Sequence, residues 1–428
     1  MPRRWARRHR SERAERLSSL AVLREPAFRR FMLSQVFNNL CLWTHRTAHV
    51  WLTVVVTGSD PFGVGLVTAL QFLPMMLSAS GGGLGDRWSK RRVLLASQVV
   101  AVAGCLVLAT VSLTGTVTLP LLCLLAVVLG STAAIDAPVR LAFPREIVEQ
   151  QVLKSAIGLN GIVFQSARVV GPAVAGLLIV HGGESVGFLV AAGCGIVALV
   201  FLATISPRRT GTPEEGAVVP WRTTLRAVRR DPELLSPLVG AVLVGACLSN
   251  LQVALPLILD RIPSAGAGGF GLLIATIGLG GACGALTASA VRGGQGPRSL
   301  NLFLVVFALA TLVVAAMPGV ASMGLVLFVC GLVMQLYNTN ALTGLQEASP
   351  LGQHGRVMGL YVVAYFVWAG LGTPFFGLAA GAVGPRPMLA VSALVCAVAG
   401  GLLLAFWSPA RARAAAPVGR RRLTSRTS

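Results

Sequence analysis

The sequence predicts an all-α membrane protein in which twelve transmembrane helices form two pseudo-symmetric six-helix bundles. Hydrophobic residues make up 54% of the 428 residues and charged residues only 12%, whereas about a quarter of the residues in soluble domains are charged. Apolar runs of roughly 20 residues, the length that crosses a bilayer, recur along the chain. A weak repeat at an offset of about 202 residues, which aligns Pro172 with Pro374, indicates the two halves.

The breaks between the predicted spans alternate in character. One set is short and nearly uncharged, and the other is longer and rich in arginine. Each run is long enough to cross the hydrocarbon core once. The twelve spans are expected at residues 31–56, 62–84, 93–114, 118–138, 155–180, 186–205, 234–258, 268–290, 299–316, 320–343, 357–381 and 386–408.

The spans divide the chain into five segments. The predicted linker contains Trp221, Leu225 and Val228 between arginines, a pattern typical of an amphipathic helix at the membrane surface. The expected order is a basic N-terminal segment (1–30), the first six-helix bundle (31–205), the linker (206–233), the second bundle (234–408) and a basic tail (409–428).

The net charge of +21 reports membrane topology. Of the 36 Lys and Arg residues, 32 fall in the N-terminal segment, the linker, the tail and the arginine-rich breaks. The positive-inside rule therefore predicts a multi-pass protein of the cell membrane with both termini cytoplasmic. A soluble protein this basic would be expected to bind nucleic acid. Here the arginines flank spans on one face, so the lipid bilayer is the expected partner and nucleic acid is not.

The break between spans 2 and 3 contains the clearest motif, GGLGDRWSKRR at 82–92. It resembles the G-x-x-x-D-R-x-G-R-R/K signature of the major facilitator superfamily, with Ser89 in place of a glycine. The resemblance implies the major facilitator fold and a conformational gate in which an acid caps the start of span 11. The alternative is a basic turn that only sets topology. The candidate gate residues are Gly82, Asp86, Arg87, Lys90, Arg91, Asp136, Arg140 and Arg356.

Further runs resemble the enterobactin-exporter-like branch of that superfamily, which exports drugs and siderophores. They are DAPVR at 136–140, ARVVGPAVAG at 167–176, NLQVALP at 250–256 and GRVMGLY at 355–361. In span 5, Gly158, Gly171, Pro172 and Gly176 also follow a loose form of the superfamily's antiporter signature. The resemblance associates this signature with export by antiport. Ordinary packing of small residues between helices is the alternative.

Polar residues inside spans are functional candidates because their burial in lipid is costly. The resemblance implies that spans 1, 4, 7 and 10 line a central cavity, which many of these residues would face. Arg46 and Arg168 would make that cavity cationic and favour an anionic or neutral amphipathic substrate, although Arg168 has helix packing as an alternative role. The candidate cavity residues are Asn38, His45, Arg46, His49, Arg168, Asn250, Gln252, Gln335, Asn338, Tyr361 and Tyr365.

Three residues are candidates for proton coupling. His45 and His49 lie on one stripe of span 1, and imidazole titrates near neutral pH. Asp136 lies near the predicted cytoplasmic end of span 4. The alternatives are helix packing for the histidines and a gate contact to Arg87 or Arg140 for Asp136. No third ligand accompanies the histidine pair and the eight cysteines show no metal-ligand spacing, so neither a metal nor another cofactor is expected.

These features together predict a secondary active transporter that works by alternating access. Its expected activity is proton-coupled efflux of a small amphipathic molecule, such as a drug-like compound, a siderophore or a secondary metabolite. The sequence contains no nucleophile elbow and no nucleotide-binding loop, so an enzyme is not expected. The alternatives are an importer with the same fold and a non-transporting membrane sensor or assembly protein. The protein is expected to act as a monomer.

Overall fold

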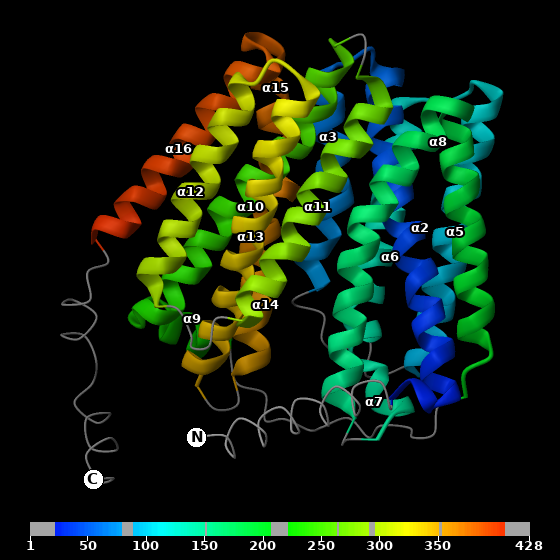
Figure 1. The fold of residues 1–428 in the computed structure, drawn as a ribbon, viewed down its shortest axis with the longest axis horizontal. Helices are drawn as coiled ribbons and strands as arrows, with labels where there is room; N and C mark the ends of the chain where they lie inside the picture. Colours follow the sequence, from blue (N-terminus) through cyan, green and yellow to red (C-terminus); the bar gives the residue numbers. More distant parts are fainter. Residues whose placement is uncertain are drawn as a thin grey trace, which may run out of the picture.

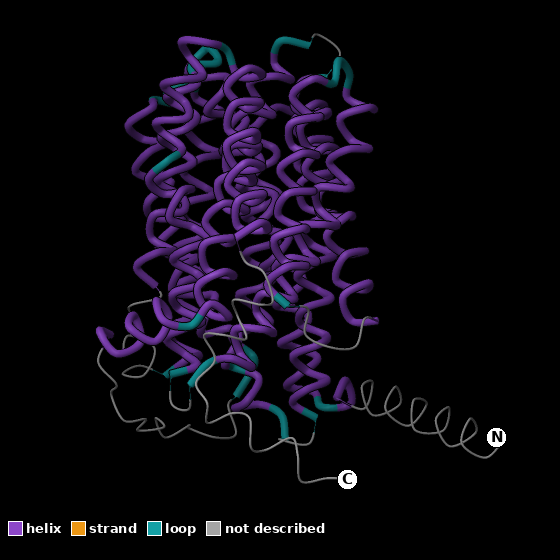
Figure 2. Tube along the Cα trace, turned by 90° about the vertical axis from the view of Figure 1, so that its left-hand side faces the viewer, coloured by secondary structure: helices purple, strands orange, loops and turns teal. Residues whose placement is uncertain are grey.

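The computed structural model describes residues 22–78, 89–149, 152–206, 221–262, 265–290, 296–350 and 353–406. Within these ranges the chain forms long, roughly parallel helices and no strand (Figure 2), which confirms the predicted all-α fold. A short 3-10 helix, η1 (Val22–Arg24), precedes them. The helices are α2 (Pro26–Thr57), α3 (Pro61–Ser78), α5 (Lys90–Thr114), α6 (Leu119–Ala142), α7 (Pro144–Ile147), α8 (Leu153–Ala203), α9 (Trp221–Arg230), α10 (Pro232–Asp260), α11 (Gly266–Ala290), α12 (Pro297–Ala316), α13 (Val320–Ala348), α14 (His354–Leu371), α15 (Thr373–Val383) and α16 (Pro385–Phe406).

Nine helical segments of the described chain are long and apolar enough to cross a membrane, with α14 and α15 counted as one. Helix α3 is a shorter apolar helix, and α2 falls outside the nine because its polar residues lower its mean hydropathy. Helix α8 crosses twice because its 51 residues break at Gly183, where φ is 77°. Its two ends lie beside the start of α2, since Asn160 bonds Gln35 and the Ala198 carbonyl accepts from Ser34. The described helices therefore account for twelve crossings.

Proline and glycine set many of the helix ends. Proline favours the first helical turn, where its missing N–H is not needed, and glycine adopts the left-handed conformation that ends a helix. Helices α2 and α5 end at Gly58 (φ 60°) and Gly115 (φ 66°). After the α2 turn, the Asp60 carboxylate accepts hydrogen bonds from the Phe62 and Gly63 N–H groups, which caps the start of α3. The left-handed glycines and the Asp60 cap allow short connections between α2 and α3 and between α5 and α6.

The two ends of the bundle differ in what they carry. Helices α7 and α9 lie at one end (Figure 1), which we name the basic end because α9 holds four arginines and α5 begins there with Lys90. The other end, named the opposite end, carries the turns at Gly58, Gly115 and Gly183. Helix α9 packs against α10 and α14 with Val228 buried.

The two halves of the molecule stand side by side (Figure 1). Helices α10, α12, α13, α14 and α16 gather on one side, and α2, α5, α6 and α8 on the other. The halves meet where α8 packs on α11 and where α3 packs on α14 and α15. Contacts at the opposite end include a hydrogen bond from Ser59 to Asp260 and the Trp51 ring stacked on Phe270.

Glycine allows the closest approach between the halves. A Cβ atom on Gly176 of α8 would lie 2.8 Å from the Ala267 carbonyl oxygen and 3.0 Å from the Gly271 Cα of α11. These distances are shorter than van der Waals contact, so a side chain here would push the helices apart. A Cβ atom on Gly158, near the basic end of α8, would meet nothing within 4 Å. Helices α8 and α11 are thus tightly packed at Gly176, whereas Gly158 faces open space.

Candidate functional site

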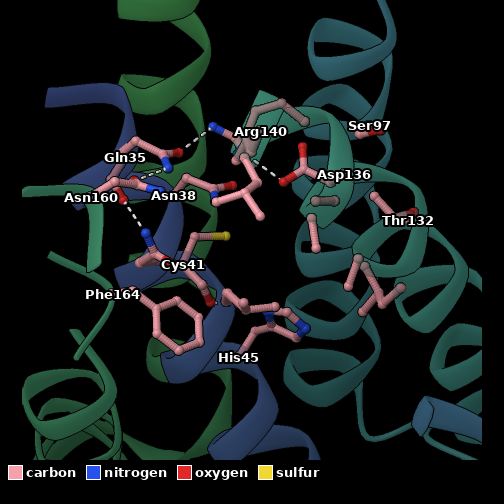
Figure 3. Close-up of a pocket in the computed structure, with 18 of the residues that line it drawn as sticks. Gln35, Asn38, Cys41, His45, Ser97, Thr132, Asp136, Arg140, Asn160 and Phe164 are labelled. Atoms are coloured by element: carbon pink, nitrogen blue, oxygen red, sulfur yellow. Dashed lines mark hydrogen bonds and ion pairs between the residues drawn. The ribbon is translucent and has the colours of Figure 1, made fainter. Parts of the chain in front are cut away.

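A cavity of about 360 Å³ lies within the first half, between α2, α5, α6 and α8 (Figure 3). Part of its wall is apolar, with Leu42, Leu129 and Phe164 among the lining residues. Another part is polar and includes Asn38, His45, Ser97, Thr132, Asp136 and Arg140. A cavity of mixed character suits a molecule with an apolar body and a few polar groups.

The polar wall of the cavity is organised around Arg140. Its guanidinium pairs with Asp136, one helical turn earlier on α6. The same group donates to the Gln35 Oε1 and Gln98 Oε1 atoms, each at 2.9 Å, and Gln35 in turn donates to Asn160. Arg140 is only 4% exposed, and a buried cation is stable only when it is paired and hydrogen-bonded. This network satisfies that requirement and joins α2, α5, α6 and α8.

A second cationic group lies deeper along α2, centred on the Trp43 ring. The Arg46 guanidinium lies 6.0 Å from the Trp43 ring centroid and 5.3 Å from that of Phe72, and the Arg168 guanidinium lies 5.7 Å from the Trp43 centroid. These distances fit cation–π contact. Among the described residues neither arginine pairs with a carboxylate. In the described part of the chain, the contacts of these two guanidiniums that we identify are to aromatic rings.

Unused hydrogen-bond donors surround Arg46. A small cavity of about 50 Å³ is lined by Trp43, Arg46, Gln71, Phe72 and Gln252, among others. The Trp43 indole Nε1 and the Gln71 Nε2 are buried without a hydrogen-bond acceptor among the residues that the structure describes. Buried donors normally find partners. These two donors and the Arg46 guanidinium are groups to which an acceptor oxygen or an anion could bind.

Aromatic side chains connect this pocket to the second half. The Phe72 ring of α3 stacks on Phe366 of α14 at 5.5 Å, and Phe366 contacts Tyr365, which stacks on Tyr361 at 6.2 Å. The Tyr361 hydroxyl donates to the Asn338 Oδ1 at 2.8 Å. Gln165 of α8 donates to the Gln335 Oε1 of α13 at 3.4 Å. Four candidates from spans 10 and 11 thus lie on the second half's side of this central region: Gln335, Asn338, Tyr361 and Tyr365.

The remaining cavity candidates divide between the two cavities and the packed interior of the helices. His45 lines the larger cavity with its Nδ1 atom 2.9 Å from the Cys41 carbonyl oxygen. His49 is fully buried and lines neither of the two cavities. Asn250 is also buried and accepts a hydrogen bond from the Trp368 Nε1 at 2.9 Å, which ties α10 to α14 within the second half. His49 and Asn250 thus lie in helix packing, whereas Gln252 lies beside Arg46.

The candidate gate residues divide into two groups. Gly82, Asp86 and Arg87 lie outside the described residues. Lys90 forms an ion pair with Glu146 of α7 at 2.6 Å, and the Arg91 Nη2 donates to the Ala203 carbonyl oxygen at 2.6 Å. Both contacts join the start of α5 to neighbouring helices of the first half, α7 and α8, at the basic end. Arg356 lies in the first turn of α14.

The span 5 motif serves two different contacts. A Cβ atom on Gly171 would overlap with the Trp43 Cβ atom and approach the Trp43 and Thr44 backbone, so this glycine lets α2 and α8 lie close together. Gly176 and the carbonyl of Pro172 meet Gly271 of α11 at the contact between the halves. Gly158 faces open space.

Sequence reasoning missed several residues that complete these sites. Gln35 and Gln98 hold Arg140, and both are polar residues inside predicted spans, the same signal that selected Asn38. Trp43 and Phe72 were missed because an aromatic residue in a membrane span normally indicates packing against lipid or neighbouring helices. Only the fold brings their rings beneath two arginines.

Comparison with known proteins points to one family of transporters. The profile of a family described as "Transmembrane secretion effector" matches residues 17–421. The enterobactin exporter EntS of Salmonella choleraesuis is 26% identical over 406 residues, which cover 91% of this chain and 94% of that protein. EntS of Shigella boydii serotype 18 is 27% identical over 411 residues, with the same coverage.

Solved structures share the fold at low sequence identity. The crystal structure of the nucleoside transporter NupG superposes with a TM-score of 0.68 at 13% identity, covering 90% of this chain and 99% of that chain. A bacterial homolog of the human lysosomal transporter Spinster, in an inward-facing and unoccupied conformation, gives a TM-score of 0.69 at 16% identity, with 90% and 99% coverage.

Proposed function

Since the chain belongs to the transmembrane secretion effector family of major facilitator transporters, we propose that it exports small amphipathic anions by alternating access. It is a multi-pass membrane transporter of a small molecule and not an enzyme. The observation that carries the proposal is the pair of arginines on the Trp43 ring. Neither pairs with a carboxylate of the described chain, and two buried N–H donors near them have no hydrogen-bond acceptor among the described residues. A membrane protein retains such buried cations where they bind something.

The contacts between the halves support alternating access. The halves touch along α8–α11 and α3–α15 towards the opposite end, whereas Gly158 near the basic end of α8 faces open space. If the basic end is cytoplasmic, as the distribution of arginine predicts, these contacts close the external side of the molecule in this conformation. Both termini then lie in the cytoplasm and the protein resides in the cytoplasmic membrane. Rocking of the two halves would reverse the access.

The polar and aromatic groups define the proposed substrate class. Two arginines, an indole N–H and a glutamine amide offer hydrogen-bond donors, and the rings of Phe72 and Tyr365 offer apolar faces. An aromatic anion, or an aromatic ligand rich in oxygen acceptors, would use both. The relatives are named as enterobactin exporters, so a siderophore is the first substrate to test.

Asp136 is the proposed site of proton coupling. It is the carboxylate that lines the larger cavity, where it pairs with Arg140. A proton on Asp136 would cancel this ion pair and leave Arg140 held by Gln35 and Gln98 alone, which loosens the junction of four helices. His49 is fully buried and lines neither cavity, which favours Asp136 over His49 as the coupling group.

The direction and coupling can be tested together in proteoliposomes of the purified protein, with radiolabelled enterobactin as the probe. Export coupled to inward protons predicts accumulation in vesicles whose lumen is acidic, and collapse of that accumulation when a protonophore is added. Accumulation in vesicles with an alkaline lumen would instead indicate an importer, and the absence of movement with either gradient would contradict transport of this probe.

Asp136→Asn separates coupling from substrate passage. This variant is expected to retain exchange of labelled for unlabelled enterobactin across the membrane and to lose at least tenfold of the pH-driven accumulation, because one proton that moves down a gradient of one pH unit supplies about 1.4 kcal/mol. His49→Gln is the matched control and should accumulate like wild type. Full pH-driven accumulation by Asp136→Asn would exclude Asp136 as the coupling group.

A further inference from the structure

Two cysteines and a histidine from separate positions in the sequence meet beside the larger cavity, which Cys41 and His45 line. The Sγ atoms of Cys41 and Cys105 and a ring nitrogen of His45 all lie within 4.8 Å of one another. The exposed fractions of the three residues are 2%, 0% and 5%. Cys41 and His45 are one turn apart on α2, as Figure 3 shows, whereas Cys105 comes from α5. The sequence did not suggest this set because its third member lies on another helix.

The hydrogen bond of His45 determines which of its ring nitrogens can bind a metal ion. The Nδ1 atom lies 2.9 Å from the Cys41 carbonyl oxygen, and since a carbonyl only accepts hydrogen bonds, neutral His45 carries its proton on Nδ1. The Nε2 atom then keeps its lone pair. Metal-binding histidines usually have this arrangement, in which one nitrogen donates to a carbonyl or carboxylate and the other binds the metal.

We propose that Cys41, Cys105 and His45 bind a zinc ion. Two sulfur ligands and one imidazole nitrogen are the preferred donors of this ion. On binding, the two thiols release their protons and form two Zn–S bonds, so the dication and two thiolates sum to zero charge. A neutral unit is far less costly to bury than a lone ion.

The location of the site leaves room for a fourth ligand. Zinc is tetrahedral, and a site with three protein ligands keeps one position for water or another donor. Cys41 and His45 both line the larger cavity, so this position is expected to face it. An oxygen donor of a molecule in the cavity would compete with water there. The zinc site stands independently of transport, because it is measured on the purified protein without a substrate.

The test titrates zinc into the purified full-length protein, kept reduced in detergent, against a chromophoric chelator. We expect one tightly bound ion per chain. Cys41→Ser, Cys105→Ser and His45→Gln should each weaken binding at least about tenfold, since even loss of a hydrogen bond to a metal ligand costs that much. The matched control is Cys247→Ser/Cys396→Ser, because these two buried cysteines also contact each other but have no histidine beside them.

Cobalt supplies a measurement on the unmodified chain. Co²⁺ in place of zinc should produce a thiolate-to-cobalt charge-transfer band with the intensity of two thiolate ligands. Because this band is measured on wild-type protein, the result does not depend on whether a variant folds. His49→Gln should leave the band unchanged. The proposal is overturned if the band is missing in wild type, if zinc binds equally well to Cys41→Ser and Cys105→Ser, or if the two cysteines form a disulfide under these reducing conditions.

Discussion

Replacing Arg46 or Arg168 by glutamine is expected to weaken the affinity for an aromatic carboxylate substrate by about 10- to 100-fold. A hydrogen bond to a charged group contributes about 1.5–3 kcal/mol, and each 1.4 kcal/mol corresponds to a factor of ten in affinity. Both guanidiniums lie on the Trp43 ring without a carboxylate partner in the described chain. A bound anion would therefore be their main counter-charge.

The contribution of charge is isolated by comparing an aromatic carboxylate substrate with its uncharged amide analogue. The concentration dependence of the initial transport rate in proteoliposomes measures both affinities. The two glutamine variants should bind the amide nearly as well as wild type does, and Arg→Lys at either position should fall between, since lysine keeps the charge but not the planar stacking group. Equal losses for carboxylate and amide would mean that the arginines act through packing.

Arg386→Gln is the matched control for this prediction. Arg386 is also an arginine near a span, but its Nη1 atom donates to the carbonyl oxygens of Ala315 and Met317, at 3.2 and 2.5 Å. It ties the start of α16 to the end of α12 at the opposite end. Its replacement should leave substrate affinity unchanged.

Arg140→Met is expected to lower the free energy of unfolding by about 3 kcal/mol, because it leaves the Asp136 carboxylate buried without a counter-ion. It also leaves the Gln35 and Gln98 carbonyl oxygens without their donor. Thermal unfolding of the purified protein in detergent measures the change. The loss of one cation thus removes the junction between α2, α5 and α6.

Two further variants test the cause of this loss. Arg140→Met/Asp136→Leu should recover much of the stability, since removing both charges of a buried pair costs little. Lys90→Met breaks the Lys90–Glu146 pair, whose Lys90 side chain is 27% exposed, and should cost less than about 1 kcal/mol. If Arg140→Met and Lys90→Met unfold alike, the Arg140 network does not hold the helices together.

Much of the fold could be predicted because span length and apolar composition are local properties. The span expected at 299–316 is the helix Pro297–Ala316, and the span at 93–114 is Lys90–Thr114. The arrangement of the candidate residues could not be predicted in the same way. His45 and His49 share a stripe of α2, but His49 is fully buried against other helices and only His45 reaches the cavity. Gln35 and Gln98, which hold Arg140, and Cys105, which lies beside Cys41, come from other helices, and periodicity does not reveal such contacts.

The central claim, that the halves alternate between two closures, is tested most directly by distances across each end. Fluorescent amino acids incorporated at Leu141 and His354 report the basic end, and a pair at Thr116 and Val383 reports the opposite end; all four residues are exposed. Gly271→Val should favour the other conformation, because its side chain would overlap with Gly176 of α8 at a cost of about 1–3 kcal/mol. Gly193→Val, where a Cβ atom would meet nothing within 4 Å, is the control.

Gly271→Val is expected to shorten the Leu141–His354 distance and to lengthen the Thr116–Val383 distance, whereas Gly193→Val should change neither. Unchanged distances in Gly271→Val, or a lengthening at both ends, would contradict alternating access between the two halves.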